Sequence, residues 1–166
     1  AGTTTFGNSG TLTLGDGGGD TTNFTGGVIA TAPSITIDGI IRTSGGGVTL
    51  GSATKGLTVF GNVNIDTTNN SDPLYFAGAN VNLNGAVDGD TNWASLTVNA
   101  GTLGDITVSQ NIGATTALSA LNLTGEVINI NASTIKLDGG PGNTSTWNGA
   151  VVLGANGVTV DVDGVA

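Results

Sequence analysis

A short pattern of an apolar residue, a small polar residue and a second apolar residue recurs along this chain and constrains its fold. It is the alternation expected of a strand with one buried face, with the outer residues pointing inward and the middle one toward water. The strands are predicted to be about three to five residues long. The thirteen instances are Leu12-Thr13-Leu14, Ile35-Thr36-Ile37, Val48-Thr49-Leu50, Leu57-Thr58-Val59, Val63-Asn64-Ile65, Leu74-Tyr75-Phe76, Val81-Asn82-Leu83, Leu96-Thr97-Val98, Ile106-Thr107-Val108, Leu121-Asn122-Leu123, Ile128-Asn129-Ile130, Ile135-Lys136-Leu137 and Val158-Thr159-Val160.

The spacing of these triplets limits how the strands can be connected. Successive triplets are commonly separated by only about 6 to 15 residues, whereas a helical crossover would need roughly a dozen or more in addition to the strands. A glycine, which adopts positive φ at little cost, follows most of the triplets. Two architectures remain, an antiparallel sandwich and a coiled solenoid.

A longer-range similarity favours the solenoid. Asn84-Gly85-Ala86-Val87 recurs as Asn148-Gly149-Ala150-Val151, and Leu57-Thr58-Val59-Phe60-Gly61 resembles Leu121-Asn122-Leu123-Thr124-Gly125, both at an offset of 64. That offset divides into about three coils of about 21 residues, whereas a sandwich has no reason to repeat internally. The predicted fold is an all-β parallel β-solenoid of about eight rungs of about 21 residues. We expect residues 1–166 to form a single segment, a subunit or fragment of a longer fibrous protein.

Composition and charge exclude several classes of function. Only 9% of the residues are charged, and the net charge of −9 includes just three cations, Arg42, Lys55 and Lys136. Binding to nucleic acid or to an anionic membrane surface needs a basic patch that this chain lacks. Cys and His are absent, which removes thiolate metal sites and the commonest general base. We therefore expect no enzyme activity and no nucleic-acid or membrane-inserted partner.

Several stretches resemble the repeats of filamentous-haemagglutinin-like and autotransporter-like surface proteins of bacteria. They are Gly46-Gly47-Val48-Thr49-Leu50, the segment from Gly78 to Val87, and Ser95-Leu96-Thr97-Val98-Asn99-Ala100-Gly101. The resemblance covers about residues 24 to 164. It implies a right-handed β-helix located outside the cell or on the bacterial cell surface, with a structural or adhesive role.

Acidic turns are the candidate metal ligands. Asp88, Asp90 and Asn92 have the spacing that opens an EF-hand loop, and calcium binds six to eight oxygen ligands of this kind. Trp93, however, occupies the position where that loop needs glycine, and Asn99 the position of its bidentate Glu. We therefore keep calcium binding by these residues as a hypothesis. The simpler interpretation is that the Asp side chains are solvated residues of turns. We expect no other cofactor.

Trp93 and Trp147 are candidate carbohydrate ligands, because exposed aromatic rings on a rigid face can stack on sugars. The alternative is that each ring fills a rung corner in a core with few aromatic residues. The first functional hypothesis is a structural segment of an extracellular fibre that self-associates end to end through open coils. The alternative is an adhesin module that binds carbohydrate or another cell surface. An ice-binding solenoid is a lesser alternative, because the Thr-x-Thr pattern is confined to Thr3-Thr4-Thr5 and Thr11-Leu12-Thr13.

Overall fold

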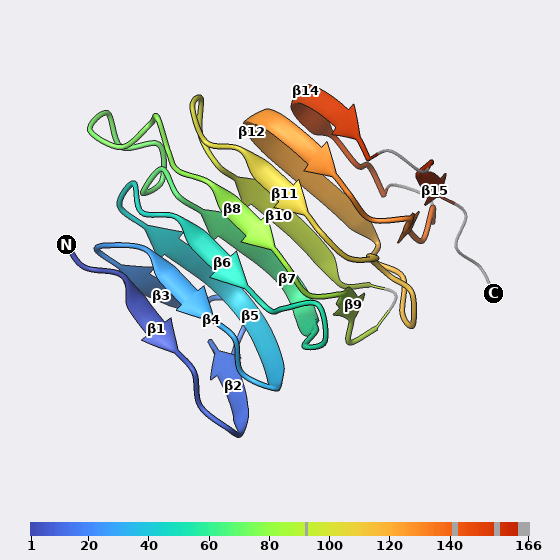
Figure 1. The fold of residues 1–166 in the computed structure, drawn as a ribbon, viewed down its shortest axis with the longest axis horizontal. Helices are drawn as coiled ribbons and strands as arrows, with labels where there is room; N and C mark the ends of the chain where they lie inside the picture. Colours follow the sequence, from blue (N-terminus) through green and yellow to red (C-terminus); the bar gives the residue numbers. More distant parts are fainter. Residues whose placement is uncertain (92, 141–142, 155–156, 163–166) are drawn as a thin grey trace.

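A computed structural model describes residues 1–91, 93–140, 143–154 and 157–162, and it confirms an all-β parallel β-solenoid. Every pairing between two named strands is parallel, and no described residue is helical. The chain winds through three walls per turn, so each strand pairs with the strand one coil before it and one coil after it. Figure 1 shows the coils stacked from the N-terminal to the C-terminal end.

Each wall is a ladder of short strands. The first wall contains β1 (Thr4–Phe6), β4 (Val28–Ala30), β6 (Val48–Leu50), β8 (Val81–Leu83), β11 (Ile106–Val108) and the ends of β12 (Ala120–Ile130) and β14 (Trp147–Leu153). The second contains β2 (Thr11–Leu14), the starts of β5 (Ser34–Thr43) and β7 (Leu57–Asp66), then β9 (Val87–Gly89), β13 (Thr134–Lys136) and β15 (Thr159–Asp161). The third contains β3 (Thr21–Phe24), the ends of β5 and β7, β10 (Ser95–Asn99) and the starts of β12 and β14.

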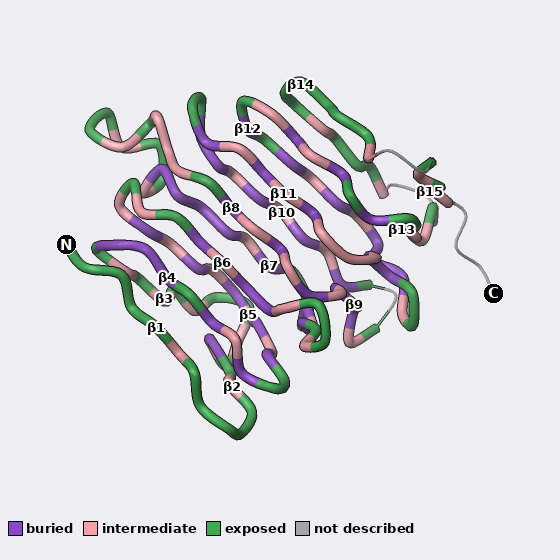
Figure 2. Tube along the Cα trace, viewed as in Figure 1, coloured by how far each residue is buried: buried purple, intermediate pink, exposed green. Residues whose placement is uncertain are grey.

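The core consists of aliphatic columns that run along the solenoid inside the three walls. On the first wall, the register places Ala30, Leu50, Leu83, Val108 and Ile130 one above another. All of these side chains are buried. The residue between each inward pair faces out, which gives the alternating burial along the strands in Figure 2. The inward orientation predicted from the triplets is therefore confirmed in the central coils.

The long strands pass from one wall to the next by bending at a glycine. β5 bends between the second and third walls at Gly39, where φ is +76°. A Cβ atom at Gly39 would lie 2.5 Å from the backbone oxygen of Asp20 in the preceding coil. Only glycine combines this backbone conformation with so close an approach. This corner of the solenoid is therefore fixed by backbone packing.

The solenoid has fewer and longer coils than the sequence pattern predicts. Seven strand segments follow one another on the first wall, so the described chain completes six turns and begins a seventh coil, rather than the predicted eight rungs. The turns also differ in length, because Val48 is paired with Val28 on one side and with the more distant Val81 on the other. Most of the extra length is in the loop at 67–80. The corresponding corners at 25–27, 44–47 and 100–105 are much shorter.

Two details of the sequence prediction are wrong. The triplet at 74–76 lies in the 67–80 loop and forms a turn rather than a strand, with Leu74 82% exposed. The offset of 64 does not relate equivalent positions either. Leu57 lies on the second wall, opposite Ile35 and Val87, whereas Leu121 lies on the third wall, opposite Leu96. The similarity at that offset therefore reflects the biased composition of the chain and not a structural repeat.

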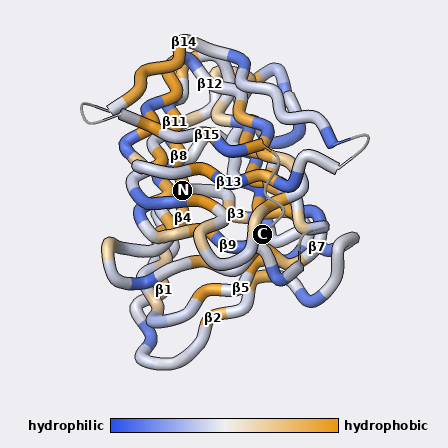
Figure 3. The backbone as a smooth tube through the Cα atoms, turned by 90° about the vertical axis from the view of Figure 1, so that its right-hand side faces the viewer, coloured by the Kyte–Doolittle hydropathy of each residue, from blue (hydrophilic) through white to orange (hydrophobic). Residues whose placement is uncertain are grey.

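The two ends of the solenoid differ in how they cover the core. At the N-terminal end, Phe6 and Phe24 are half-buried and meet edge to face, with ring centroids 6.1 Å apart. At the C-terminal end, hydrophobic residues of β14 remain exposed, and they are visible at the top of Figure 3. The described residues therefore place aromatic rings at one end and bare aliphatic side chains at the other.

Candidate functional site

The predicted calcium ligands Asp88 and Asp90 are hydrogen-bond acceptors for different neighbouring coils. Oδ1 of Asp88 accepts hydrogen bonds from the backbone N–H groups of Thr115 (2.8 Å) and Thr116 (3.2 Å) in the next coil. Oδ1 of Asp90 accepts one from Gly61 N–H (3.2 Å) in the preceding coil. The third predicted ligand, Asn92, lies outside the described residues. Each described carboxylate thus fixes a turn of an adjacent coil.

A second pair of acidic residues occupies the Gly-rich turn between β2 and β3. The backbone N–H of Asp16 donates to Oδ2 of Asp20 at 3.0 Å. A hydrogen bond between the two carboxyl groups raises the pKa of Asp16, and repulsion from the Asp20 charge adds to the rise. The same hydrogen bond lowers the pKa of Asp20. Among the described residues, no cluster of three or more acidic side chains is arranged to hold a metal ion.

The two tryptophans predicted to bind carbohydrate do not come together. Trp147 is half-buried, packs against the core and donates from Nε1 to the carbonyl oxygen of Leu121 at 3.2 Å. Trp93 is 81% exposed. On the third wall, Trp147 is paired with Leu123, and Leu123 is paired with Val98 of β10. Val98 lies five residues after Trp93, so Trp147 is at a different position along the wall from Trp93 and two coils further along the solenoid. Trp147 therefore has a packing role, and Trp93 alone presents its ring to solvent.

Trp93 belongs to a continuous edge that we call the second corner, the turn from the second to the third wall in each coil. Phe60, 52% exposed, lies at this corner one coil before Trp93. The two coils are joined by the hydrogen bond from Asp90 N–H to Val59 O, at 2.9 Å. On the other side, the Ser119 hydroxyl donates to the carbonyl oxygen of Trp93 at 3.1 Å. Two exposed aromatic side chains thus occupy adjacent coils of one corner.

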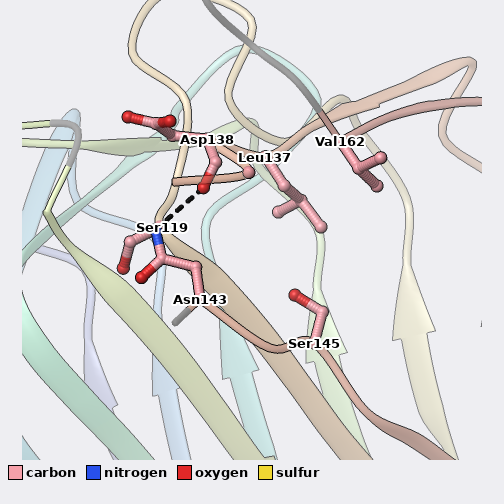
Figure 4. A pocket seen from close by; sticks show the side chains of 7 residues that line it. Ser119, Leu137, Asp138, Asn143, Ser145 and Val162 are labelled. Carbon is pink, nitrogen blue, oxygen red and sulfur yellow. Dashed lines mark hydrogen bonds between the residues drawn. The ribbon is translucent and has the colours of Figure 1, made fainter. Parts of the chain in front are cut away.

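A recess of about 150 Å³ continues the second corner toward the C-terminal end. Figure 4 shows its lining side chains, which come from the fifth, sixth and seventh coils. Asn143 Nδ2 donates to the backbone oxygen of Asp138 at 2.9 Å, and the amide oxygen accepts no hydrogen bond from any described residue. The Ser145 hydroxyl oxygen accepts from Leu121 N–H at 2.9 Å and retains its own proton to donate. The recess is lined by Ser119, Leu137, Asp138, Gly139, Asn143, Ser145 and Val162.

The recess combines hydrogen-bonding groups, one of them a carboxylate, with an apolar edge. Asn143 and Asp138 offer acceptor oxygens, and Ser145 offers a donor. Leu137 and Val162 supply an apolar edge. A small polar molecule with several hydroxyl groups would satisfy such a lining.

The outward threonines are too mixed to form one regular array. On the second wall, Thr13, Thr36 and Thr58 align in register, but Asp88 continues the row. On the first wall, Thr49, Asn82, Thr107 and Asn129 alternate.

No family model, curated protein or solved structure matches this chain. Within the described ranges, the structure contains no helix that is long and apolar enough to cross a membrane.

Sequence reasoning missed most of the second corner. Phe60 follows the triplet at 57–59 directly, in the place where most triplets lead to a small turn residue, and this was a usable signal. Ser119, Asn143 and Ser145 are ordinary residues of a chain rich in Ser and Asn. Only the stacking of coils brings them to one recess, so no local pattern could have identified them.

Proposed function

We propose that this chain is a structural segment or subunit of a bacterial extracellular fibre or surface protein, joined end to end through its open coils. The observation that supports this proposal is the exposure, among the described residues, of inward columns in the last coil. Val151, Leu153 and Val160 continue the inward columns of Ile128, Ile130 and Ile135, yet they are 41%, 55% and 42% exposed. Their counterparts one coil earlier are fully buried. A further coil on this end would bury them in the same way.

The surface of the rod supports the same role. An open solenoid edge with unpaired backbone groups tends to pair with another strand, which is a hazard for a monomer and a means of assembly for a fibre. The walls present mainly Thr and Asn outside, with few charges, as suits a rod with a passive surface. The resemblance of the repeats to bacterial surface β-helix proteins supports an extracellular location for the proposed fibre.

Immunogold electron microscopy of intact source cells, with antibody raised against this chain, tests the proposal. Gold in rows along extracellular filaments is the expected result. Gold scattered over the envelope would favour an adhesin, and gold confined to the cytoplasm would contradict both roles.

A second candidate function, recognition of carbohydrate by an adhesin module, is favoured by the exposed ring of Trp93. Burial of this indole would stabilise the core, yet the side chain is 81% exposed. The sequence contains few aromatic residues, so the exposed position of this one favours a binding role. An adhesin would remain monomeric and show saturable binding to a glycan, whereas a fibre subunit would associate with itself.

A further inference from the structure

From the second corner we infer a binding site for a neutral oligosaccharide that runs along the solenoid edge from Phe60 and Trp93 to the polar recess. This inference rests on the second proposed function, carbohydrate recognition, and is independent of fibre assembly. It specifies the location of the site, its principal residues and the class of sugar.

The first step is the alignment of aromatic and polar groups on one edge. Consecutive coils lie roughly 4.8 Å apart, and Phe60 and Trp93 belong to the second corner of two such coils. Ser119 of the next coil donates from its hydroxyl to the backbone carbonyl oxygens of Trp93 and Ala94, and it also lines the recess. An elongated ligand would therefore meet two apolar faces and then a group of hydrogen-bonding side chains. Sugar rings present this combination, with apolar C–H faces and hydroxyl edges.

The second step is the availability of the polar groups. Asn143 and Ser145 each retain a hydrogen-bonding function that is not used by any described residue. Among the described residues, the Asp138 carboxylate takes part in no hydrogen bond, and Figure 4 shows it at the outer edge of the recess. A carboxylate and an amide oxygen accept hydrogen bonds from hydroxyl groups, and the Ser145 hydroxyl donates one. The volume of about 150 Å³ is below that of a drug-sized pocket, so the recess would hold one sugar residue of a longer chain.

The third step is charge, which decides between neutral and acidic sugars. Among the described residues, the second wall and second corner of coils four to seven carry four carboxylates, Asp88, Asp90, Asp138 and Asp161, against one cation, Lys136. Lys136 is paired in register with Asp161. An acidic oligosaccharide would be repelled by this surface, whereas a neutral one would not.

The test is a glycan array followed by titration of the best-binding neutral oligosaccharide. Trp147→Phe leaves Trp93 as the single tryptophan, so a change in its fluorescence on titration would report binding at the second corner. Isothermal titration calorimetry, which does not depend on tryptophan fluorescence, measures the affinities of the variants. We expect Trp93→Ala to weaken binding about tenfold or more, because a large exposed aromatic ring typically dominates such contacts. Ser145→Ala should weaken it less. Phe76→Ala, which removes an exposed ring on a different corner, should leave the affinity unchanged and serves as the matched control.

The possible outcomes distinguish failure of the inferred site from failure of the proposed carbohydrate recognition. Neutral glycan binding that survives both Trp93→Ala and Ser145→Ala would overturn the site while leaving carbohydrate recognition in place. Binding confined to acidic glycans would overturn the inferred class of sugar. Failure to bind any glycan would overturn the site together with carbohydrate recognition, and fibre assembly would then be judged by its own tests. Thermal unfolding of each variant excludes loss of folding as the cause. Trp93→Ala and Phe76→Ala should match the unmodified chain, whereas Ser145→Ala and Trp147→Phe each remove a hydrogen bond to Leu121 and should lower the midpoint while staying folded at the temperature of the titration.

Discussion

Single inward side chains hold the coils together because each contacts its counterparts directly above and below. Leu83 is 1% exposed and lies between Leu50 and Val108 in the first-wall column. Leu83→Ala is expected to lower the free energy of unfolding by about 2 to 5 kcal/mol, the usual cost of a cavity at a buried leucine. Denaturant unfolding measures this loss. Thr107→Ala, at an outward position of the next coil, should change stability by about 0.5 kcal/mol or less. Equal effects of the two substitutions would contradict the inward assignment.

Alanine substitutions at two corner glycines would distinguish the cost of backbone strain from the cost of steric overlap between coils. Gly39 and Gly61 occupy the second corner in neighbouring coils, with φ of +76° and +62°. A Cβ at Gly39 would lie 2.5 Å from Asp20 O, whereas one at Gly61 would meet nothing within 4 Å. Gly61→Ala should therefore lower the unfolding free energy by about 1 to 2 kcal/mol, from the left-handed conformation alone. Gly39→Ala should cost at least about 1 kcal/mol more, because the coils must shift apart.

Urea unfolding of both alanine variants tests this difference. A larger loss for Gly61→Ala than for Gly39→Ala would show that coil contact does not govern this corner. Both variants change glycine to alanine at positive φ, so each serves as the control for the other.

At the scale of elements, the 67–80 loop is the largest departure from the regular coil. Asn69, Asn70 and Ser71 all have positive φ, an uncommon run for residues other than glycine. The buried Asp66 holds this turn, because its carboxylate accepts from the N–H and hydroxyl of Thr68 (3.0 and 2.6 Å) and from Asn70 N–H (2.6 Å). The strain of the loop is thus offset by hydrogen bonds to one charged group.

Removal of that carboxylate is predicted to release the loop without unfolding the walls. Asp66→Ala removes the acceptor of four donors, the N–H and hydroxyl of Thr68, Asn70 N–H and Asn99 Nδ2. It also leaves Arg42, whose Nε lies 3.7 Å from Asp66 Oδ2, without its partner. The loss in stability should be about 3 kcal/mol. Chymotrypsin should then cut near Leu74 and Phe76 faster than in the unmodified chain, as measured by the rate of fragment formation. Asp72→Asn keeps the acceptor for Leu74 N–H and should leave the cleavage rate unchanged. An unchanged rate for Asp66→Ala would show that other contacts hold the loop.

The strand pattern predicts the walls but not the lengths of the corners. Triplets such as Val81-Asn82-Leu83 are strands with the predicted faces because alternation is a local property. The triplet at 74–76 has the same pattern, yet it falls in an inserted loop where no neighbouring strand covers it. Corner lengths depend on how each turn packs on the coil beneath, which no local pattern records. The predicted number of coils was therefore too high, while the fold class was confirmed.

The candidate site was predictable only in part, for a related reason. Trp93 was identifiable because an aromatic residue is rare in this sequence. The place of Phe60 on the same corner was not predictable, because it follows from the register of two coils whose corners are far apart in sequence. Trp147 has the same residue type and an Asn-rich context like that of Trp93, yet it contacts the core. Burial, rather than residue type, distinguishes the two.

At the scale of the whole molecule, stability is a sum over neighbouring coils, so the ends matter most. Each coil contacts only the coils beside it, and an end coil therefore lacks half of its partners. At the C-terminal end, β14 and β15 extend the first and second walls one level further, while the described third wall ends with the start of β14. A second copy placed head to tail would continue both walls in parallel, with Phe6 of its first coil above Leu153. A tail-to-tail contact would make the strands antiparallel and break the columns.

Head-to-tail joining is predicted to require the apolar end and to strengthen with salt. Sedimentation velocity should show an apparent mass that rises with protein concentration, and rises further from about 0.05 to about 0.5 M NaCl, because salt screens repulsion between rods of net charge −9. Leu153→Lys should remain monomeric, since its charge would be buried at the joint. Leu74→Lys, with the same net charge on an exposed side loop, should assemble like the unmodified chain. Equal inhibition by both substitutions would mean that added charge, rather than the open end, controls association.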